Sequence, residues 1–247
     1  MAFYWGLFWS YVAQYAKGRL AYGWDLLAGL ISDLTYQSVA LIFLVVIFGQ
    51  VPDLAGWRRE EVFFIYGYFL WPSTFFGALS NGIWSFADQY VIKGELDRLL
   101  LRPASPLFQL ILEGVQLESL LGLISGTVIM FWAGVRLGLT LHWYDPLLLL
   151  LLTAGSTLIY LGVYLSLMCI SFWYDGRTGI LPLLWNVNNY GRYPAPIYNK
   201  ALRILLTWVL PFAFVGFYPA AYFLRPQAYW LWAAATPLMG IALFGAA

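Results

Sequence analysis

Residues able to carry out catalysis are scarce in this sequence of 247 residues, which contains one histidine, His142, and one cysteine, Cys169. A Ser-His-Asp or Cys-His arrangement is therefore not expected, and neither is a disulfide or a thiolate metal site within one chain. The sequence also lacks the Gly-x-x-x-x-Gly-Lys-Ser/Thr loop that binds nucleotide phosphates. We predict that the chain alone is not an enzyme and binds no metal or cofactor. If it pumps, the energy comes from a partner or an ion gradient.

Acidic and amide side chains near position 113 are one candidate for a transport pathway. Glu113 and Glu118 lie early in an apolar stretch, where carboxylates are costly unless they face protein or water. Gln109, Glu113 and Gln116 follow one another at i, i+4 and i+7, so we expect them to share one helix face. This stripe either lines a pathway or subunit seam, or marks a helix end whose carboxylates reach the headgroup water.

Asparagines form a second polar group, at positions 186, 188 and 189. Asparagine side chains in a membrane helix more often hold helices together than bind a substrate. We therefore keep two interpretations open for Asn186 and Asn189, a pathway lining and a contact between helices.

The region with the densest charge is residues 88–103, called the charged segment below. It carries six charged side chains between apolar stretches, in a chain that is only 10% charged. Ile92, Leu96, Leu99 and Leu100 recur at helical spacing, which predicts a short amphipathic helix with one apolar face. A solvated loop is the alternative. We assign a partner-binding role to Asp88, Lys93, Gly94, Glu95, Leu96, Asp97, Leu100, Arg102 and Pro103.

Composition places the chain in a membrane. It is 62% hydrophobic and 20% aromatic, whereas about a quarter of the residues of a soluble domain are charged. Charge-free runs have about the length of 20 apolar residues that crosses the hydrocarbon core. These runs are 34–52, 62–87, 119–135, 146–174, 204–224 and 226–247. The net charge of +1 gives no basic surface for nucleic acid.

The runs predict an all-α polytopic membrane protein with six transmembrane helices in one permease domain, residues 1–247. We expect spans near 26–48, 62–86 with a kink at Pro72, 107–132, 145–173, 178–190 and 228–244. Tyr and Trp prefer the headgroup level, so residues 1–22 read as an interfacial helix. Prolines at 211 and 219 make residues 197–224 a re-entrant hairpin.

Lys and Arg do not orient the chain, because nearly equal numbers fall on the two sides of this topology. The N-terminus and the charged segment lie on one side, since two spans separate them. The hairpin lies on the other side, and to it we assign Arg192, Tyr193, Pro194, Arg203, Pro211, Tyr218 and Pro219.

Two ordered motifs resemble the permease subunits of type-2 ATP-binding-cassette (ABC) exporters. They are closest to the six-span class that includes antibiotic and daunorubicin-resistance exporters. The first is Ile-x-x-Gly-x-Leu-Asp-x-Leu-Leu-x-Arg-Pro, which the segment from Ile92 to Pro103 resembles. The second runs in order through Arg192-Tyr193-Pro194, Ile197-Tyr198, Leu202-Arg203, Leu210-Pro211-Phe212-Ala213-Phe214 and Tyr218-Pro219-Ala220. Tyr22 with Asp25 is a weaker match.

This resemblance implies that the charged segment is a cytoplasmic coupling helix in a cleft of a cytosolic ABC ATPase dimer. ATP and Mg would then be bound by that partner. It also implies cytoplasmic termini, an outward-facing hairpin and the inner membrane of a prokaryote. A second permease, a copy or a sister chain, would complete the usual twelve spans. From the residues alone, an ion-coupled carrier using Glu113 and Glu118 and a non-transporting membrane scaffold stay open.

Overall fold

The computed structural model describes residues 2–21, 23–112, 115–140, 142–173 and 180–247. Apart from one two-stranded hairpin, the described elements are helical, which agrees with the predicted all-α class. The long helices are α1 (Ala2–Ala21), α2 (Gly23–Phe48), α3 (Arg59–Leu79), α7 (Leu121–Leu137), α8 (Asp145–Met168) and α12 (Pro226–Ala246). The short ones are α4 (Asn81–Phe86), α5 (Leu96–Leu100), α6 (Pro106–Leu112), α9 (Ile180–Asn188), α10 (Lys200–Ile204) and α11 (Phe217–Leu224).

Several helices are extended or joined by short 3₁₀ or π segments. The π-helical turns are η1 (Ala87–Ile92) and η6 (Leu205–Val209). The 3₁₀ segments are η2 (Leu117–Leu120), η3 (Cys169–Phe172), η4 (Asn189–Arg192), η5 (Ala195–Ile197) and η7 (Phe212–Phe214). A π-helical turn widens the backbone and often occurs at functional sites.

Among the described residues, four helices are long and apolar enough to cross a membrane. They are Gly23–Phe48, Arg59–Leu79, Asp145–Phe172 and Pro226–Ala246. Helix α7 has 17 residues and directly follows η2, whereas α9 has only 9 residues. The protein is therefore a polytopic helical membrane protein, and the count of six spans stays a prediction.

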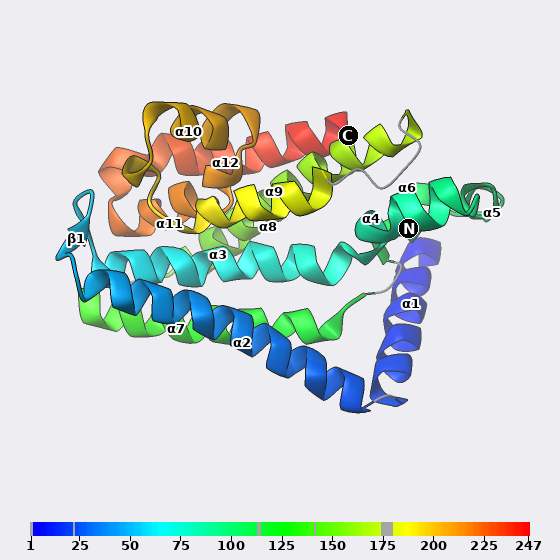
Figure 1. Cartoon of the computed structure of the whole chain (residues 1–247), viewed down its shortest axis with the longest axis horizontal. Helices are drawn as coiled ribbons and strands as arrows, with labels where there is room; N and C mark the ends of the chain where they lie inside the picture. Colours follow the sequence, from blue (N-terminus) through cyan, green and yellow to red (C-terminus); the bar gives the residue numbers. More distant parts are fainter. Residues whose placement is uncertain (1, 22, 113–114, 141, 174–179) are drawn as a thin grey trace.

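The helices α2, α3, α7, α8, α9 and α12 run along one common direction, as Figure 1 shows. At one end, α1 lies steeply across this bundle, close to α5 and α6 (Figure 1). At the other end lie the β-hairpin and the helices α10 and α11 (Figure 1). The charged segment and residues 197–224 thus occupy opposite ends of the bundle. The interfacial placement of α1 and the re-entrant nature of 197–224 stay predictions.

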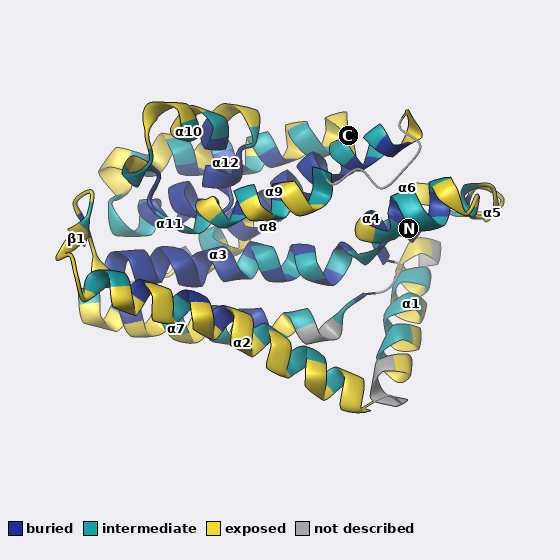
Figure 2. Ribbon diagram, viewed as in Figure 1, coloured by how far each residue is buried: buried dark blue, intermediate teal, exposed yellow. Residues whose placement is uncertain are grey.

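Helix α3 lies at the centre of the bundle and packs against both α7 and α8. Most of its first three turns are buried, whereas α2 is largely exposed (Figure 2). Close approach to α7 depends on two glycines, since a Cβ built on Gly126 would lie 2.7 Å from the carbonyl oxygen of Gly67. Small residues allow such contact between membrane helices. Gly155 of α8 and Gly240 of α12 likewise allow these two helices to approach closely.

The second and third predicted spans are shorter than the sequence indicated. Helix α3 passes through Pro72 without ending and stops at Leu79, so the expected continuous span 62–86 is wrong. The expected span 107–132 is also interrupted, because Val115 and Gln116 are not helical. One hydrogen bond connects the two breaks. The backbone N–H of Gln116 donates to the carbonyl oxygen of Ala78 at 3.1 Å, which joins the two interruptions.

A tight hairpin connects α2 to α3. Strands β1 (Asp53–Leu54) and β2 (Trp57–Arg58) are antiparallel, and Ala55 and Gly56 between them have φ angles of 53° and 81°. Positive φ at both central residues is the geometry of the turn that best matches strand twist. The carboxylate of Asp53 accepts the N–H of Gly56 at 2.8 Å and holds the turn closed.

Candidate functional site

The charged segment is not one continuous helix. Its first part is η1, a continuation of α4, and its second part is α5. Between them Gly94 has a φ of 72°, a left-handed conformation that L side chains rarely adopt. The single apolar face predicted from Ile92 to Leu100 is therefore wrong, because the chain changes direction at Gly94.

This change of direction exposes apolar side chains. Leu99 is buried and Leu96 half-buried, but Ile92 and Leu100 are 54% and 57% exposed, and Leu101 is 86% exposed. Large exposed apolar groups beside charges are typical of a surface that binds another protein. Ile92, Leu100 and Leu101 give the charged segment such a surface.

Several charges of the segment have local partners, whereas others do not. Lys93 Nζ lies 3.4 Å from a carboxylate oxygen of Asp88, and the side chain of Gln89 donates to Glu95 at 3.1 Å. In the part of the chain that the structure describes, Asp97 and Arg98 make no ion pair, and both are exposed. These two charges remain available to a partner.

The segment is tied to α6 through Arg102 and Gln109. Arg102 Nη1 donates to Gln109 Oε1 at 3.4 Å, and Gln109 donates to the carbonyl oxygen of Ala104 at 2.9 Å. Gln109 is only 2% exposed, whereas Arg102 is exposed, so this contact is partly buried. Pro103 lies in the turn that these bonds close. These bonds connect the end of α5 to α6.

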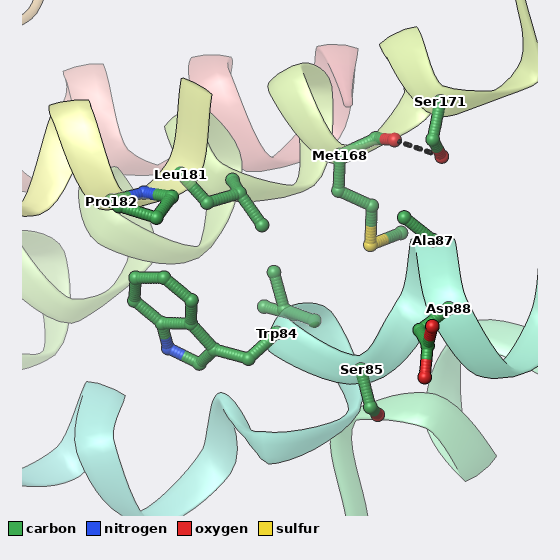
Figure 3. Close-up of a pocket in the computed structure, with 9 residues that line it drawn as sticks. Trp84, Ser85, Ala87, Asp88, Met168, Ser171, Leu181 and Pro182 are labelled. Atoms are coloured by element: carbon green, nitrogen blue, oxygen red, sulfur yellow. Dashed lines mark hydrogen bonds between the residues drawn. The ribbon is translucent and has the colours of Figure 1, made fainter. Parts of the chain in front are cut away.

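A cavity of about 350 Å³ lies beside the charged segment. Figure 3 shows Trp84, Ala87 and Asp88 on one side and Met168, Leu181 and Pro182 on the other. The cavity separates α4 and η1 from the end of α8 and the start of α9. The charged segment thus begins on an element that is loosely packed on one side.

The expected polar stripe on α6 is not formed. Helix α6 ends at Leu112, and Gln116 lies outside it, where its side chain donates to Asn81 at 3.4 Å. Gln109 and Gln116 therefore do not share a helix face. Glu113 lies outside the described residues. Glu118 lies in η2, and its side chain is outside the described part.

The structure brings a different set of polar side chains together, between α2, α3 and α9. A cavity of about 110 Å³ lies there, and its polar lining includes Gln37, Ser73, Asn188 and Asn189. Asn189 accepts a hydrogen bond from the hydroxyl of Tyr36 at 2.9 Å. Gln109 and Gln116 are not among the residues lining this cavity.

Asn188 is the buried member of the asparagine group, at 1% exposure. Its side-chain oxygen accepts the hydroxyl of Tyr160 at 2.5 Å, and Tyr160 is also bonded to Ser73 at 3.0 Å. The side-chain nitrogen of Asn188 has no hydrogen-bond partner in the described structure. Asn186 is exposed on another face of α9 and does not line the cavity.

Sequence reasoning weighted Asn186 above Asn188, and it missed Gln37, Ser73 and Tyr160. A signal was present, because polar residues inside charge-free runs need partners. The sequence did not show which of these residues form hydrogen bonds with one another, since they come from different helices. Buried amide and hydroxyl groups make this the polar centre of the bundle.

At the opposite end, the predicted hairpin residues fall into two groups. Pro194, Pro211, Tyr218 and Pro219 are buried, whereas Arg203 is exposed on α10. A separate set lies near the end of η4. Arg192 Cζ lies 5.2 Å from the ring centroid of Tyr193, and its Nε has no partner in the described structure. Burial raises the pKa of the Tyr198 phenol, which stays protonated and donates to the carbonyl oxygen of Tyr190 at 2.9 Å.

A partly buried ion pair joins α3 to the junction of α11 and α12 at this end. Arg225, between α11 and α12, donates from Nη2 to both carboxylate oxygens of Glu61 at 3.0 Å. Its Nη2 also donates to the carbonyl oxygen of Gly56 at 2.7 Å, and its Cζ lies 3.9 Å from the ring centroid of Trp57. We call this group the Arg225 clasp. No pattern of residue types or spacing predicted this pairing.

Comparison with known proteins decides the family. The sequence profile of a family described as "ABC-2 family transporter protein" matches residues 34–247. The chain belongs to the ABC-2 transporter family. No curated protein and no solved structure matches it. The resemblance found from the motifs is thereby confirmed at the level of the family.

Membership in the ABC-2 family makes this chain a permease, with an ATPase and the membrane as its partners. The bundle of this ABC-2 permease has three regions that differ in their exposed and buried groups. One end carries exposed charged and apolar groups, the bundle contains a polar cavity, and the other end is closed by an ion pair. Among the described residues no group of His, Cys, Asp or Glu could hold a metal ion.

Proposed function

We propose that this chain is the transmembrane subunit of an ABC exporter and that a separate cytosolic ATPase drives it by docking on the charged segment. The observation that carries the proposal is the exposure of Leu100, Leu101, Asp97 and Arg98 on one short element. Such a mixture of apolar and charged groups is available for a partner. ATP and Mg would be held by the ATPase.

The elements around the charged segment support transmission of a push. The bond between Arg102 and Gln109 links α5 to α6, and Gly82 of α4 leaves no room for a side chain against α6. A Cβ on Gly82 would lie 2.1 Å from the carbonyl oxygen of Leu110. The cavity of about 350 Å³ on the other side of α4 and η1 gives this unit space to shift.

We further propose that the polar cavity forms half of the translocation pathway and that a second permease, a copy or a sister chain, supplies the rest. Helix α2 supports this assembly, since its outward face is apolar and lies beside the cavity, with Val39, Ile42, Phe43 and Val46 exposed. The proposed location is the cytoplasmic membrane of a prokaryote, with α1 and α5 on the cytoplasmic side.

The test is purification of the tagged chain from its own host, followed by measurement of Mg-ATP hydrolysis in the purified complex. Wild-type chain should carry ATPase activity. Asp97→Arg combined with Leu101→Ser should lower the co-purified activity about tenfold, the loss expected from removing interface anchors. Arg136→Ala, an exposed residue at the other end of the bundle, should leave it unchanged.

Absence of ATPase activity from the wild-type complex would contradict the proposal, and so would full activity in the Asp97→Arg, Leu101→Ser variant. The ion-coupled carrier is the alternative function. It predicts transport that follows an imposed proton gradient in vesicles without ATP. Transport that needs ATP and is unaffected by a proton ionophore would exclude that alternative.

A further inference from the structure

A third cavity lies at the end of the bundle opposite the charged segment. It has a volume of about 420 Å³ and opens between α10 and η6 on one side and α11 and α12 on the other. We call it the aromatic groove. Its lining includes Lys200, Arg203, Thr207, Trp208, Tyr218 and Trp232.

The floor of the aromatic groove is a stack of rings. Tyr218 and Trp232 lie parallel, with ring centroids 4.6 Å apart and an interplanar angle of 9°. Trp208 extends the floor, its centroid 6.0 Å from that of Trp232. The hydroxyl of Tyr218 is hydrogen-bonded to Thr207 at 3.1 Å, so it does not present a free polar group to the groove.

Two positively charged side chains lie at the rim of the groove. Asn199 caps α10 by accepting the N–H of Leu202 at 2.9 Å, which fixes the first turn of this helix. Lys200 and Arg203 are three residues apart on that turn and therefore lie on one face. Both are exposed, and both line the groove.

No acidic residue of this region neutralises these cations. The sequence contains no Asp or Glu from position 176 to 247. Within the described residues, Lys200 and Arg203 make no ion pair, whereas Arg225 nearby is paired with Glu61. The rim of the aromatic groove thus carries two positive charges without protein counter-ions.

We infer that the aromatic groove binds the anionic headgroup of a membrane phospholipid. The phosphate is held by Lys200 and Arg203, and the glycerol and first acyl carbons lie on Trp208 and Trp232. Tryptophan rings prefer the headgroup level of a bilayer, and Lys and Arg attract anionic lipids there. A cationic ligand would be repelled by the rim. A small soluble anion would leave the aromatic floor uncovered.

This inference needs only a chain embedded in a bilayer and does not depend on an ATPase. The test is native mass spectrometry of the purified chain after exchange into detergent with added phosphatidylglycerol or phosphatidylcholine. Wild-type chain should retain phosphatidylglycerol in preference to phosphatidylcholine. Lys200→Gln combined with Arg203→Gln should reduce the retained phosphatidylglycerol about tenfold, because two charge contacts are lost.

Arg136→Gln is the control, because Arg136 is an exposed arginine in the last turn of α7, with its Cζ 6.0 Å from the ring centroid of Trp132. It should retain as much phosphatidylglycerol as wild type. A second variant, Trp208→Ala, removes a ring that is 65% exposed and should also weaken retention. Because the changed side chains are exposed, the variants should keep the thermal midpoint of the wild type.

Three results would overturn the inference. The first is equal retention of phosphatidylglycerol by the Lys200→Gln, Arg203→Gln variant and by wild type. The second is equal retention of the two lipids by wild type. The third is displacement of phosphatidylglycerol by inorganic phosphate at matched concentration, which would show a site for soluble anions instead of a lipid.

Discussion

Removal of the arginine in the Arg225 clasp should destabilise the end of the bundle where α11 meets α12. The change to test is Arg225→Ala. It deletes the contacts to Glu61, the hydrogen bond to Gly56 at 2.7 Å and the contact with the ring of Trp57 at 3.9 Å. Glu61 would remain buried, with its side chain 7% exposed and the N–H of Arg58 at 2.7 Å as its remaining donor.

The magnitude follows from burial. Breaking a buried ion pair by removing one partner costs about 3–5 kcal/mol. The side chain of Arg225 is 39% exposed, so solvent screens part of the interaction. We therefore expect about 2–3 kcal/mol for Arg225→Ala. For a chain of this length, each kcal/mol corresponds to a change of about 2–4 °C in the thermal midpoint, which gives a decrease of about 4–12 °C.

The assay is thermal unfolding in detergent micelles, followed by far-ultraviolet circular dichroism. Glu61→Gln and the double variant complete a double-mutant cycle, which isolates the pairwise energy. The double variant should lose less free energy of unfolding than the two single variants lose in sum. It lacks both the Glu61 carboxylate and the Arg225 guanidinium, so neither charge is left unpaired. Arg136→Ala serves as the control for loss of an exposed arginine. If Arg225→Ala moved the midpoint no further than this control, or if the cycle showed no coupling, the reasoning would be refuted.

Two further pairs of variants test the packing and the polar centre. Gly126→Leu should lower stability by about 3 kcal/mol, since its Cβ would meet the backbone of Gly67 at 2.7 Å. Gly134→Leu on the same helix should lower stability much less, because a Cβ at Gly134 would have its nearest neighbour at an ordinary contact distance of 3.8 Å. Equal thermal midpoints for the two variants would contradict this prediction. Asn188→Ala should cost about 1 kcal/mol by removing a bond between helices. Asn186→Ala should be neutral in the same melting experiment, and a larger loss there would reverse our assignment of the buried asparagine.

Much of the fold could be predicted because membrane helices are local structures. A run of apolar residues must satisfy its backbone hydrogen bonds within itself, so composition and length alone predict a helix. Helix α8 begins at Asp145, the first residue of the predicted span 145–173. The carboxylate of Asp145 accepts the N–H of His142 at 2.7 Å. The single histidine, His142, thus lies just before α8, outside any helix.

Prediction failed where a distant part of the chain competes for a backbone group. Gln116 lies outside the helices, where the carbonyl oxygen of Ala78 and the side chain of Asn81 accept hydrogen bonds from it. Periodicity carries no information about such a partner. Periodicity also cannot distinguish a glycine inside a helix from a glycine that interrupts one. Gly94 took the left-handed conformation and divided the charged segment.

The sequence by itself determined the membrane class, the family and the position of the charged segment, since these depend on composition and on order along the chain. Only the tertiary structure decided which polar groups meet. Asn188 is buried and Asn186 exposed because α8 lies on one side of α9, and Tyr160 of α8 bonds Asn188. Arg225 and Glu61 are 164 positions apart and meet only when α3 and α11 pack together. Hydrogen bonds and ion pairs require contact within a few ångströms, and contacts between helices are set by the fold.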